Sequence, residues 1–377
     1  MARALKLDKR WGSSDRKFVA ETIYDIVRWK RLYAEIAEIK KEPFDRDGIW
    51  RMFAVWATLK GHTLPDWKYF EGTPVRKIKG KFDELSKDRK FKESIPDWMD
   101  EIGVKELGEA VWSKEIKAQN EPAKVILRTN TINTTKEALK LELLKLDIHT
   151  QAIEDYPEAL VLDERANVFM TDAFKNGMFE VQDASSQMVA HMLDIQPGMR
   201  VVDTCAGAGG KTLHMACLMQ NKGQIIAMDL YESKLKQLKI RAKRNGIHNI
   251  EYRVIDTTKV IKKLHGQADR VLIDAPCSGL GVLKRNPDAK WKLKPEFIDN
   301  IRKVQAEVLE SYAPIVKPGG KLVYATCSVL PSENQEQIKK FLATETGKNF
   351  TFVEDKKVLA HESGYDGFYM ALLTRNN

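Results

Sequence analysis

Apolar residues recur at intervals close to 3.6 through the first 120 residues of the chain, and this spacing predicts a helical region. Ser14-Asp15 can cap a helix that continues towards Ile36. Two further apolar runs with helical spacing surround Trp50–Trp56 and extend from Trp98 to Trp112. Tryptophans at such positions mostly pack in cores rather than contact ligands. We therefore assign residues 1–120 to a helical domain.

The pattern changes near Pro122, where short extended runs begin to alternate with helical ones. Thr134-Thr135 and Asp183 are typical helix caps, and each precedes apolar residues at helical spacing. Three short apolar runs are typical of strands: Val125–Leu127, Leu160–Leu162 and Met178–Val181. The combination predicts a small α+β domain over residues 121–195.

From residue 196 onward, strand-like and helix-like runs alternate along the chain. The predicted strands are Arg200–Val202, Gln224–Ala227, Ile250–Val254, Val271–Ile273, Lys321–Tyr324 and Phe368–Leu373. Helical runs between most of them predict an α/β domain over residues 196–377, with a Rossmann-like, mostly parallel, doubly wound sheet. Ligands of such sheets lie beyond the carboxyl ends of the strands, so residues directly after the strands are the functional candidates.

The composition is that of a globular protein, with 43% hydrophobic and 31% charged residues among 377. No apolar stretch is long enough to cross a bilayer. Residues 1–10 are basic, but no apolar block follows them, which argues against a secretory signal. We expect a cytoplasmic monomer without a membrane partner.

The formal net charge is +9 and the sequence pI is near 9.1, a balance that suits a polyanionic partner such as RNA. Charge alone does not decide this, because many basic proteins bind no polyanion. Its position adds to the argument, since residues 1–100 hold 23 Lys and Arg against 17 Asp and Glu. The densest basic run is Arg76–Lys81. We expect RNA affinity to reside in the helical domain.

The cysteines point away from metal and disulfide chemistry. Cys205, Cys217, Cys277 and Cys327 form no C-x-x-C pair, and none of the seven histidines forms a ligand pair at useful spacing. We therefore predict no metal site and no disulfide framework. Cys217 lies within an apolar helical run and is predicted to be a core residue. The other three lie in loop-like contexts.

A glycine-rich loop follows the first strand of the α/β domain, which ends at Asp203. Glycines there let backbone amides approach a ligand at a helix N-terminus. Gly210-Lys211-Thr212 mimics a phosphate-binding loop, but that motif needs glycine where Cys205 stands, so an NTPase is disfavoured. The candidate cofactor-binding residues of the loop are Cys205, Ala206, Gly207, Ala208, Gly209, Gly210 and Lys211.

Two acidic residues follow the next two strands. Asp229, about twenty residues after the glycine loop, can accept hydrogen bonds from both hydroxyls of a ribose. Asp256 can accept from an adenine amino group. Each residue alone could equally be a solvated strand end or a helix cap. Glycine loop, first acid and second acid in this order together predict an adenosine pocket.

Two cysteines follow the fourth and fifth strands, in Asp274–Gly281 and in Thr326–Ser328. A cytosine methyltransferase has a use for such thiols, because C5 of a neutral pyrimidine is too poor a nucleophile for methyl transfer. Thiolate addition at C6 makes C5 reactive. Asp274 is placed to hold or protonate N3 as charge develops, and it is also a candidate cofactor-binding residue. A base must then remove the C5 proton before the thiolate can leave.

A set of motifs carries a family resemblance: Leu127–Thr131, Val181–Ser185, Cys205–Thr212, Asp274–Gly281, Arg285–Asp288 with Lys290-Trp291, Lys317–Gly320, Thr326–Ser328 and Asp366–Phe368. With them, residues 121–377 resemble the Sun/RsmB-type (NSUN-like) family of RNA 5-methylcytosine methyltransferases. The resemblance implies S-adenosylmethionine as cofactor. It also implies that Cys327 is the nucleophile, and that Cys277 assists product release. One departure is Ala208, where the family usually has proline, and this should make the loop less rigid.

The helical region resembles, less specifically, the RNA-binding domain of bacterial RsmB-type enzymes, on Ser14–Val19 and Val27–Trp29. It is shortened here. This resemblance implies a small-subunit ribosomal RNA cytosine as target, with transfer RNA as the alternative. A non-catalytic RNA-binding protein of this fold would be expected to lack Cys327, Asp274 or the glycine loop, and all three are present. A DNA methyltransferase would carry a large separate recognition domain.

Overall fold

The computed structural model describes residues 5, 10–40 and 42–377. They form two compact units: unit 1 comprises residues 1–121 and 283–295, and unit 2 comprises residues 122–282 and 296–377. The prediction that residues 1–10 hold no secretory signal falls mostly on residues outside the described ones. None of the helices in the described ranges is long and apolar enough to span a membrane.

Unit 1 is helical, as its sequence pattern predicts. Its helices are α1 (Ser13–Arg28), α2 (Lys30–Ile36), α3 (Arg46–Leu59), α4 (Val75–Leu85), α5 (Arg89–Lys92), α6 (Asp97–Leu107), α7 (Glu109–Gln119) and α14 (Ala289–Lys292). The prediction of one helix from Ser14 to Ile36 is wrong in one respect. The chain leaves the helical conformation at Trp29, whose φ and ψ are −105° and 23°, and restarts as α2. The run Trp98–Trp112 is likewise divided at Gly108, where φ is +80°.

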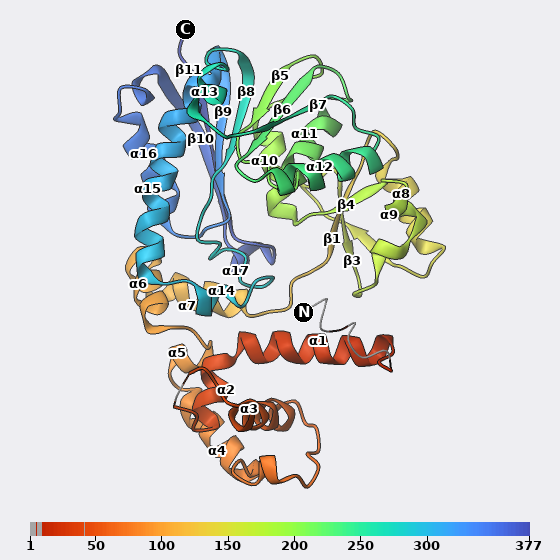
Figure 1. Ribbon diagram of the computed structural model, residues 1–377, viewed down its shortest axis with the longest axis vertical. Coiled ribbons are helices and arrows are strands. Elements are labelled where there is room, and N and C mark those ends of the chain that lie inside the picture. The colour runs from red at the N-terminus through yellow and green to blue at the C-terminus, as the bar shows by residue number, and fades with distance from the viewer. Residues whose placement is uncertain (1–4, 6–9, 41) are drawn as a thin grey trace. The chain divides into compact units, whose positions relative to one another are not determined.

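The larger sheet of unit 2 has seven strands in the order β10-β11-β9-β8-β5-β6-β7. Their bounds are β5 (Arg200–Asp203), β6 (Gln224–Asp229), β7 (Ile250–Val254), β8 (Ala268–Asp274), β9 (Val316–Thr326), β10 (Phe350–Val358) and β11 (Phe368–Arg375). The five strands from β5 to β9 pair in parallel, and β10 and β11 are antiparallel. This confirms the predicted doubly wound α/β sheet (Figure 1).

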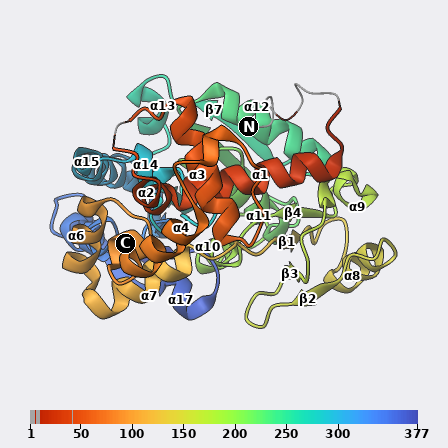
Figure 2. The ribbon, with the colours of Figure 1, turned by 90° about the horizontal axis from the view of Figure 1, so that it is seen from below.

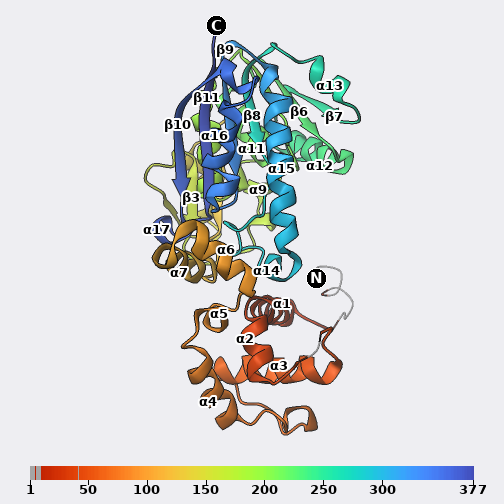
Figure 3. The ribbon, with the colours of Figure 1, turned by 90° about the vertical axis from the view of Figure 1, so that its left-hand side faces the viewer.

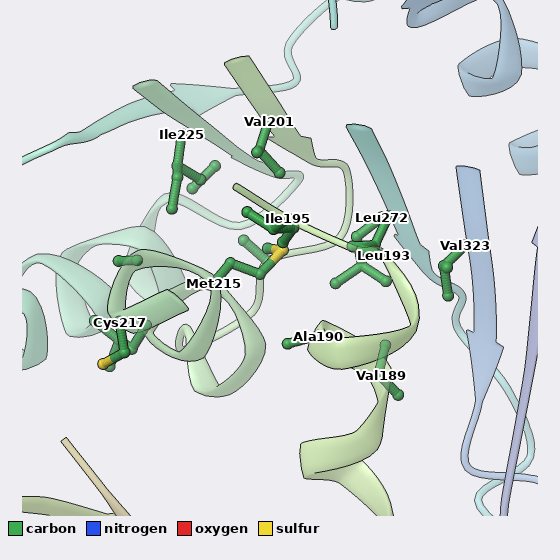
Figure 4. Packing of buried hydrophobic residues seen from close by; sticks show 14 of the residues in the cluster. Val189, Ala190, Leu193, Ile195, Val201, Met215, Cys217, Ile225, Leu272 and Val323 are labelled. Carbon is green, nitrogen blue, oxygen red and sulfur yellow. The ribbon is translucent and has the colours of Figure 1, made fainter. Parts of the chain in front are cut away.

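Successive residues of the buried strands face opposite sides of this sheet. Val201 packs in one core cluster and Val202 in the other. The first cluster lies under α10 (Ala184–Met192), α11 (Gly210–Leu218) and α12 (Glu232–Arg244). Cys217 belongs to it and is 3% exposed, which confirms its prediction as a core residue (Figure 4). The second cluster lies under α13 (Thr258–Lys262), α15 (Pro295–Tyr312) and α16 (Gln335–Leu342), and Figure 3 shows α15 and α16 along this face.

The smaller sheet of unit 2 has four antiparallel strands in the order β2-β3-β1-β4. They are β1 (Ile126–Thr129), β2 (Thr150–Ala152), β3 (Ala159–Leu162) and β4 (Phe179–Val181), accompanied by α8 (Lys136–Leu144) and α9 (Asp172–Lys175). Figure 2 shows α8 beside β2. Thr135 caps α8 and Asp183 caps α10 through their side chains, as predicted.

Two strands escaped the sequence analysis. β2 has only three residues, and β10 is an edge strand in which seven consecutive residues are exposed. β2 carries no apolar run, and in β10 the apolar residues Phe350, Phe352 and Val353 are followed at once by the charged run Glu354–Lys357. β10 is defined by its backbone pairing with β11, which is antiparallel and extends along the whole of β11. The short helix α17 (Ala360–Ser363) connects these two strands.

Candidate active site

The predicted site residues gather at one edge of the seven-stranded sheet. The glycine loop follows β5, Asp229 ends β6, Asp256 follows β7, Asp274 ends β8 and Cys327 follows β9. Because these strands are parallel, their carboxyl ends meet at the same edge. Pairing fixes the register, with Asp229 opposite Val254 and Asp274 opposite Ala325.

The two loop cysteines lie against each other. Cys277 Sγ is 3.1 Å from Cys327 Sγ, and the backbone N–H of Cys327 donates to Cys277 Sγ at 3.3 Å. The hydrogen bond with Cys327 and the burial of the thiol raise the pKa of Cys277 well above its usual value. One thiol of the pair can therefore donate its proton to the sulfur of the other.

Close backbone contacts hold the two cysteine loops together. The N–H of Gly281 donates to the carbonyl of Cys327 at 2.9 Å, and the N–H of Gly367 donates to the carbonyl of Gly281 at 2.7 Å. A Cβ on Gly281 would lie 2.2 Å from the carbonyl oxygen of Gly367. Only glycine fits at this position, which explains why the Asp274–Gly281 motif ends as it does.

Asp274 and Lys211 form an ion pair beside the cysteines, with Asp274 Oδ2 2.7 Å from Lys211 Nζ. The ammonium also lies 4.9 Å from the ring centre of Phe368. Burial alone would lower the pKa of Lys211, but the charge of Asp274 raises it above the usual value. Lys211 thus places a positive charge next to the carboxylate of Asp274, a predicted catalytic residue.

The glycine loop is fastened to Asp229. Asp229 Oδ2 accepts from the N–H of Gly207 and Oδ1 from the N–H of Tyr231, each at 2.8 Å. Gly209 has a φ of +90°, and a Cβ there would lie 2.0 Å from Leu238. By contrast, a Cβ on Gly207 or Gly210 would meet no atom within 4 Å, so open space adjoins the loop. Helix α11 starts at Gly210 and directs its N-terminus at this space.

The remaining loop residues have structural partners. The N–H of Ala206 donates to the carbonyl of Met228 at 2.9 Å. The carbonyl of Ala208 accepts from Arg241 at 2.6 Å, which fixes the position where the family has proline. Burial raises the pKa of Cys205 above its usual value, so this thiol stays protonated. Asp256 is exposed at the end of β7.

Sequence reasoning missed Asp203, the last residue of β5. Asp203 is 1% exposed, and its Oδ2 accepts from the hydroxyl of Thr212 at 2.7 Å. Its Oδ1 has no hydrogen-bond partner, and burial raises its pKa to about 7. A buried polar atom without a partner is rare and costly, so Oδ1 is a candidate for contact with a ligand. Its place at the end of the first strand was the signal that could have found it.

Among the residues that the structure describes, Glu158, His191 and His214 are the one group of three potential metal ligands that lie together. His191 Nε2 is 2.8 Å from Glu158 Oε2, and His214 Nε2 is 3.5 Å from it. A cation would have to open this direct contact beside the buried guanidinium of Arg128, whose charge acts on His214. We assign no metal here, and the absence of a metal site stays a prediction.

Two family models match the chain. The first, described as 16S rRNA methyltransferase RsmB/F, matches residues 190–374 and thus all the strand-end residues described above. The second, described as an RsmF/B-like ferredoxin-like domain, matches residues 95–169.

Curated relatives and solved structures agree with these matches. The chain is 34% identical to a probable ribosomal RNA small subunit methyltransferase B of Synechocystis and 33% identical to one of Bacillus subtilis, in each case over 75% of this chain. It spans 67% and 66% of their lengths, respectively. The crystal structure of PH0851 superimposes with a TM-score of 0.83 and 28% identity, covering 99% of this chain and 93% of that one. A methyltransferase homolog from Pyrococcus horikoshii gives a TM-score of 0.68 with 25% identity over 76% of this chain and 98% of that one.

Proposed function

Because the chain belongs to the RsmB/F family of 16S rRNA methyltransferases, we propose that it methylates C5 of a cytosine in small-subunit ribosomal RNA. The observation that carries the proposal is the thiol pair, with Cys277 Sγ and Cys327 Sγ 3.1 Å apart at the ligand-binding edge of the sheet. The curated relatives bear names of ribosomal RNA small subunit methyltransferases. Cytosine-5 as the target rests on the chemistry of the two thiols.

The proposed cofactor is S-adenosylmethionine, and the residues at the sheet edge fit it. Gly207 and Gly210 leave open space at the N-terminus of α11, and Asp203 Oδ1 is buried without a partner. Asp229 would accept from the ribose hydroxyls on the lone pairs that Gly207 and Tyr231 leave free. Asp256 would accept from the adenine amino group. When bound, the cofactor supplies an electrophilic methyl group.

Cys327 is the proposed nucleophile. The family resemblance assigns attack to this cysteine, and its sulfur lies 3.1 Å from Cys277 Sγ, within hydrogen-bonding distance. A hydrogen bond from the Cys277 thiol would stabilise a thiolate at Cys327. The thiolate would form a bond to C6 of cytosine, and the ring electrons displaced to C5 make that carbon nucleophilic.

Asp274 and Cys277 complete the proposed chemistry. Asp274, once protonated, would donate to N3 of the cytosine and so neutralise the negative charge that thiolate addition places on the ring, and the Lys211 ammonium 2.7 Å away would stabilise the carboxylate that this leaves. Cys277 would assist release, when the C5 proton is removed and the bond between C6 and Cys327 breaks. A dead methyltransferase fold is disfavoured, because these groups are all present, with the two thiols in contact and Asp274 paired with Lys211.

We also propose the three-domain division of residues 1–120, 121–195 and 196–377, with residues 283–295 joined to the helical unit and with RNA affinity in the first domain. Support for the second domain comes from its own four-stranded sheet. The chain spans about two thirds of the length of these relatives, so the RNA contacts of the whole relatives are not transferred to it.

The experiment is bisulfite sequencing of total RNA from a strain lacking the gene, compared with the parent strain. The proposal predicts the loss of one protected cytosine in small-subunit ribosomal RNA. Loss at a transfer RNA position instead would identify the alternative substrate. Unchanged protection in every RNA would contradict cytosine-5 methylation.

A further inference from the structure

Both cysteine loops are tied to a buried polar cluster formed by Glu333, Asn334 and Gln305. All three residues are fully buried. Glu333 ends the 3-10 helix η5 (Pro331–Glu333), Asn334 follows it, and Gln305 lies on α15. No motif in the sequence analysis contains any of them.

The carboxyl group of Glu333 joins the two loops directly. Its Oε1 accepts from the hydroxyls of Ser278 and Ser328, at 2.5 and 2.6 Å. Its Oε2 accepts from the backbone N–H of Ser278 at 2.8 Å and from the Gln305 amide at 3.0 Å. Ser278 follows Cys277, and Ser328 follows Cys327. One side chain therefore fixes the residue after each cysteine.

The residues before the cysteines are fixed by the rest of the cluster. The hydroxyl of Thr326 donates to Asn334 Oδ1 at 2.5 Å, and the Asn334 amide donates to the carbonyl of Ser328 at 2.9 Å. The Gln305 amide also donates to the carbonyl of Pro276 at 3.0 Å. Cys277 and Cys327 are thus held on both sides by the same cluster.

Burying a carboxyl group costs free energy that hydrogen bonds only partly offset, and an apolar side chain of similar size would often be as stable there. The hydroxyl of Tyr324, a residue of the second core cluster, donates to the backbone carbonyl of Glu333 at 2.8 Å, so the buried carboxyl group adjoins that core. The carboxyl group of Glu333 is explained by its hydrogen bonds to the two cysteine loops. Its four hydrogen bonds come from three residues, two of which follow the cysteines, and it has no ion-pair partner among the salt bridges of the described ranges.

We propose that Glu333 is a positioning residue that sets the contact between the thiols of Cys277 and Cys327. It touches no reacting atom and acts through Ser278 and Ser328. Its importance for catalysis rests on the proposed function. The geometry of the thiol pair can be tested without RNA or cofactor.

The test measures how fast phenylarsine oxide bridges the two thiols of the full-length protein, since one arsenic atom binds two sulfurs only when they lie close together. Peptide mass mapping assigns the bridge to Cys277 and Cys327. Glu333→Ala should slow bridging by at least about tenfold, because it leaves buried donors of both loops unpaired. Glu333→Gln should retain most of the rate, since its oxygen can face Ser278 N–H and Gln305 while its amide faces the two hydroxyls.

The matched control is Glu310→Ala. Glu310 also carries a carboxyl group, but it lies on α15 and accepts from Thr344 and Thr346 rather than from the cysteine loops. In Glu310→Ala, phenylarsine oxide should bridge Cys277 and Cys327 at the wild-type rate. If phenylarsine oxide bridges the two thiols of Glu333→Ala as fast as those of the wild type, the proposal is overturned. If that variant does not fold, the double variant Ser278→Ala/Ser328→Ala removes the two hydroxyl donors and carries the same expectation and the same contrary outcome.

A single-turnover methylation assay on the same variants separates this proposal from the proposed function. Glu333→Ala should lower the rate of methyl transfer and leave the dissociation constant of S-adenosylmethionine unchanged, with recovery in Glu333→Gln. If the wild type itself methylates no RNA, the proposed function fails, while the arsenical rates still decide the role of Glu333. Equal methylation rates in wild type and Glu333→Ala would contradict positioning.

Discussion

Lys290 Nζ lies 2.6 Å from the side-chain oxygen of Asn120, although 170 residues separate them in the chain. The same ammonium also donates to the carbonyls of Arg28, Glu93 and Ser94, at 3.1 to 3.2 Å. Lys290 is fully buried. Residues 283–295 follow the Cys277 loop and are nevertheless part of unit 1. The helical unit therefore cannot be built from residues 1–121 alone.

Replacement of Lys290 by methionine should destabilise unit 1. The change keeps the length of the side chain but leaves buried carbonyls and the Asn120 oxygen without a donor, at about 1–3 kcal/mol for each such group. We expect a loss of at least about 2 kcal/mol, measured by urea unfolding with limited proteolysis of unit 1. Lys292→Met is the control, because Lys292 is exposed and pairs only with Asp288. Equal midpoints for the two variants would show that the Lys290 contacts add nothing.

RNA affinity in unit 1 should be tested with point variants, because removal of residues 1–120 would strip Lys290 of its partners. Arg76 and Lys79 are exposed on α4, whereas Lys77 and Lys81 of the same run pair with Glu38. Arg76→Glu with Lys79→Glu should weaken RNA binding and reduce the slope of log affinity against log salt by about 1 for each phosphate that is no longer neutralised. Filter binding at several salt concentrations measures both. Lys348→Glu, in unit 2, is the control, and an unchanged slope would mean that RNA binds elsewhere on the protein.

Asp229 and Asp256 should differ in their effect on cofactor affinity. Asp229→Ala removes the acceptor of two backbone N–H groups as well as the proposed ribose contact, so the dissociation constant should rise by at least about tenfold. Asp256 is exposed and holds no part of the glycine loop, so Asp256→Ala should have the smaller effect. Calorimetry with S-adenosylmethionine measures both constants. Wild-type affinity in both variants would mean that the cofactor binds elsewhere.

The strand ends could be predicted from sequence, and the contacts that give them function could not. Each predicted strand of the larger sheet exists, and Cys277 and Cys327 follow β8 and β9 as expected. Local apolar runs encode this part of the fold. The pairing of Glu333 with Ser278 spans 55 residues, and that of Lys290 with Asn120 spans 170. Such buried polar pairs leave no periodic signal, because each is specified only by the folded arrangement.

The pH dependence of stability should reflect His214, which faces Glu158, His191 and Arg128. Burial lowers the pKa of His214 from 6.5 to about 4. Between these values the unfolded chain binds more protons than the folded one. Stability should therefore fall as the pH drops from about 6.5 to about 4, by up to ~3 kcal/mol. Urea unfolding at pH values across this window measures the effect.

Asp203 acts in the opposite direction, so the wild-type curve alone does not isolate His214. Burial raises the pKa of Asp203 from 3.8 to about 7, which means that the folded protein binds more protons than the unfolded chain in between. His214→Gln keeps the Asp203 contribution and removes that of the imidazole. The variant should lose less stability than the wild type on acidification. If the free energies of unfolding of the two proteins run parallel against pH, His214 titrates alike in the folded and the unfolded state.

The two thiols should be separable by substitution, because the proposed roles predict different products. Cys327→Ser should abolish methyl transfer, since an alkoxide forms far less readily than a thiolate near neutral pH. Cys277→Ser should still attack C6 and methylate, but release the product slowly. The protein would then accumulate as a covalent RNA adduct, seen as a slowly migrating band on a denaturing gel.

The double variant provides the control, and the thiol geometry sharpens the expectation. With Cys327 absent, neither Cys327→Ser nor the double variant should give an adduct. Serine at 277 keeps a hydroxyl that can still donate to the sulfur of Cys327, which lies 3.1 Å from Cys277 Sγ in the wild type, so attack should persist when release is impaired. An adduct in Cys327→Ser and none in Cys277→Ser would reverse the roles and make Cys277 the nucleophile. Loss of activity in both without any adduct would leave covalent attack by either thiol without support.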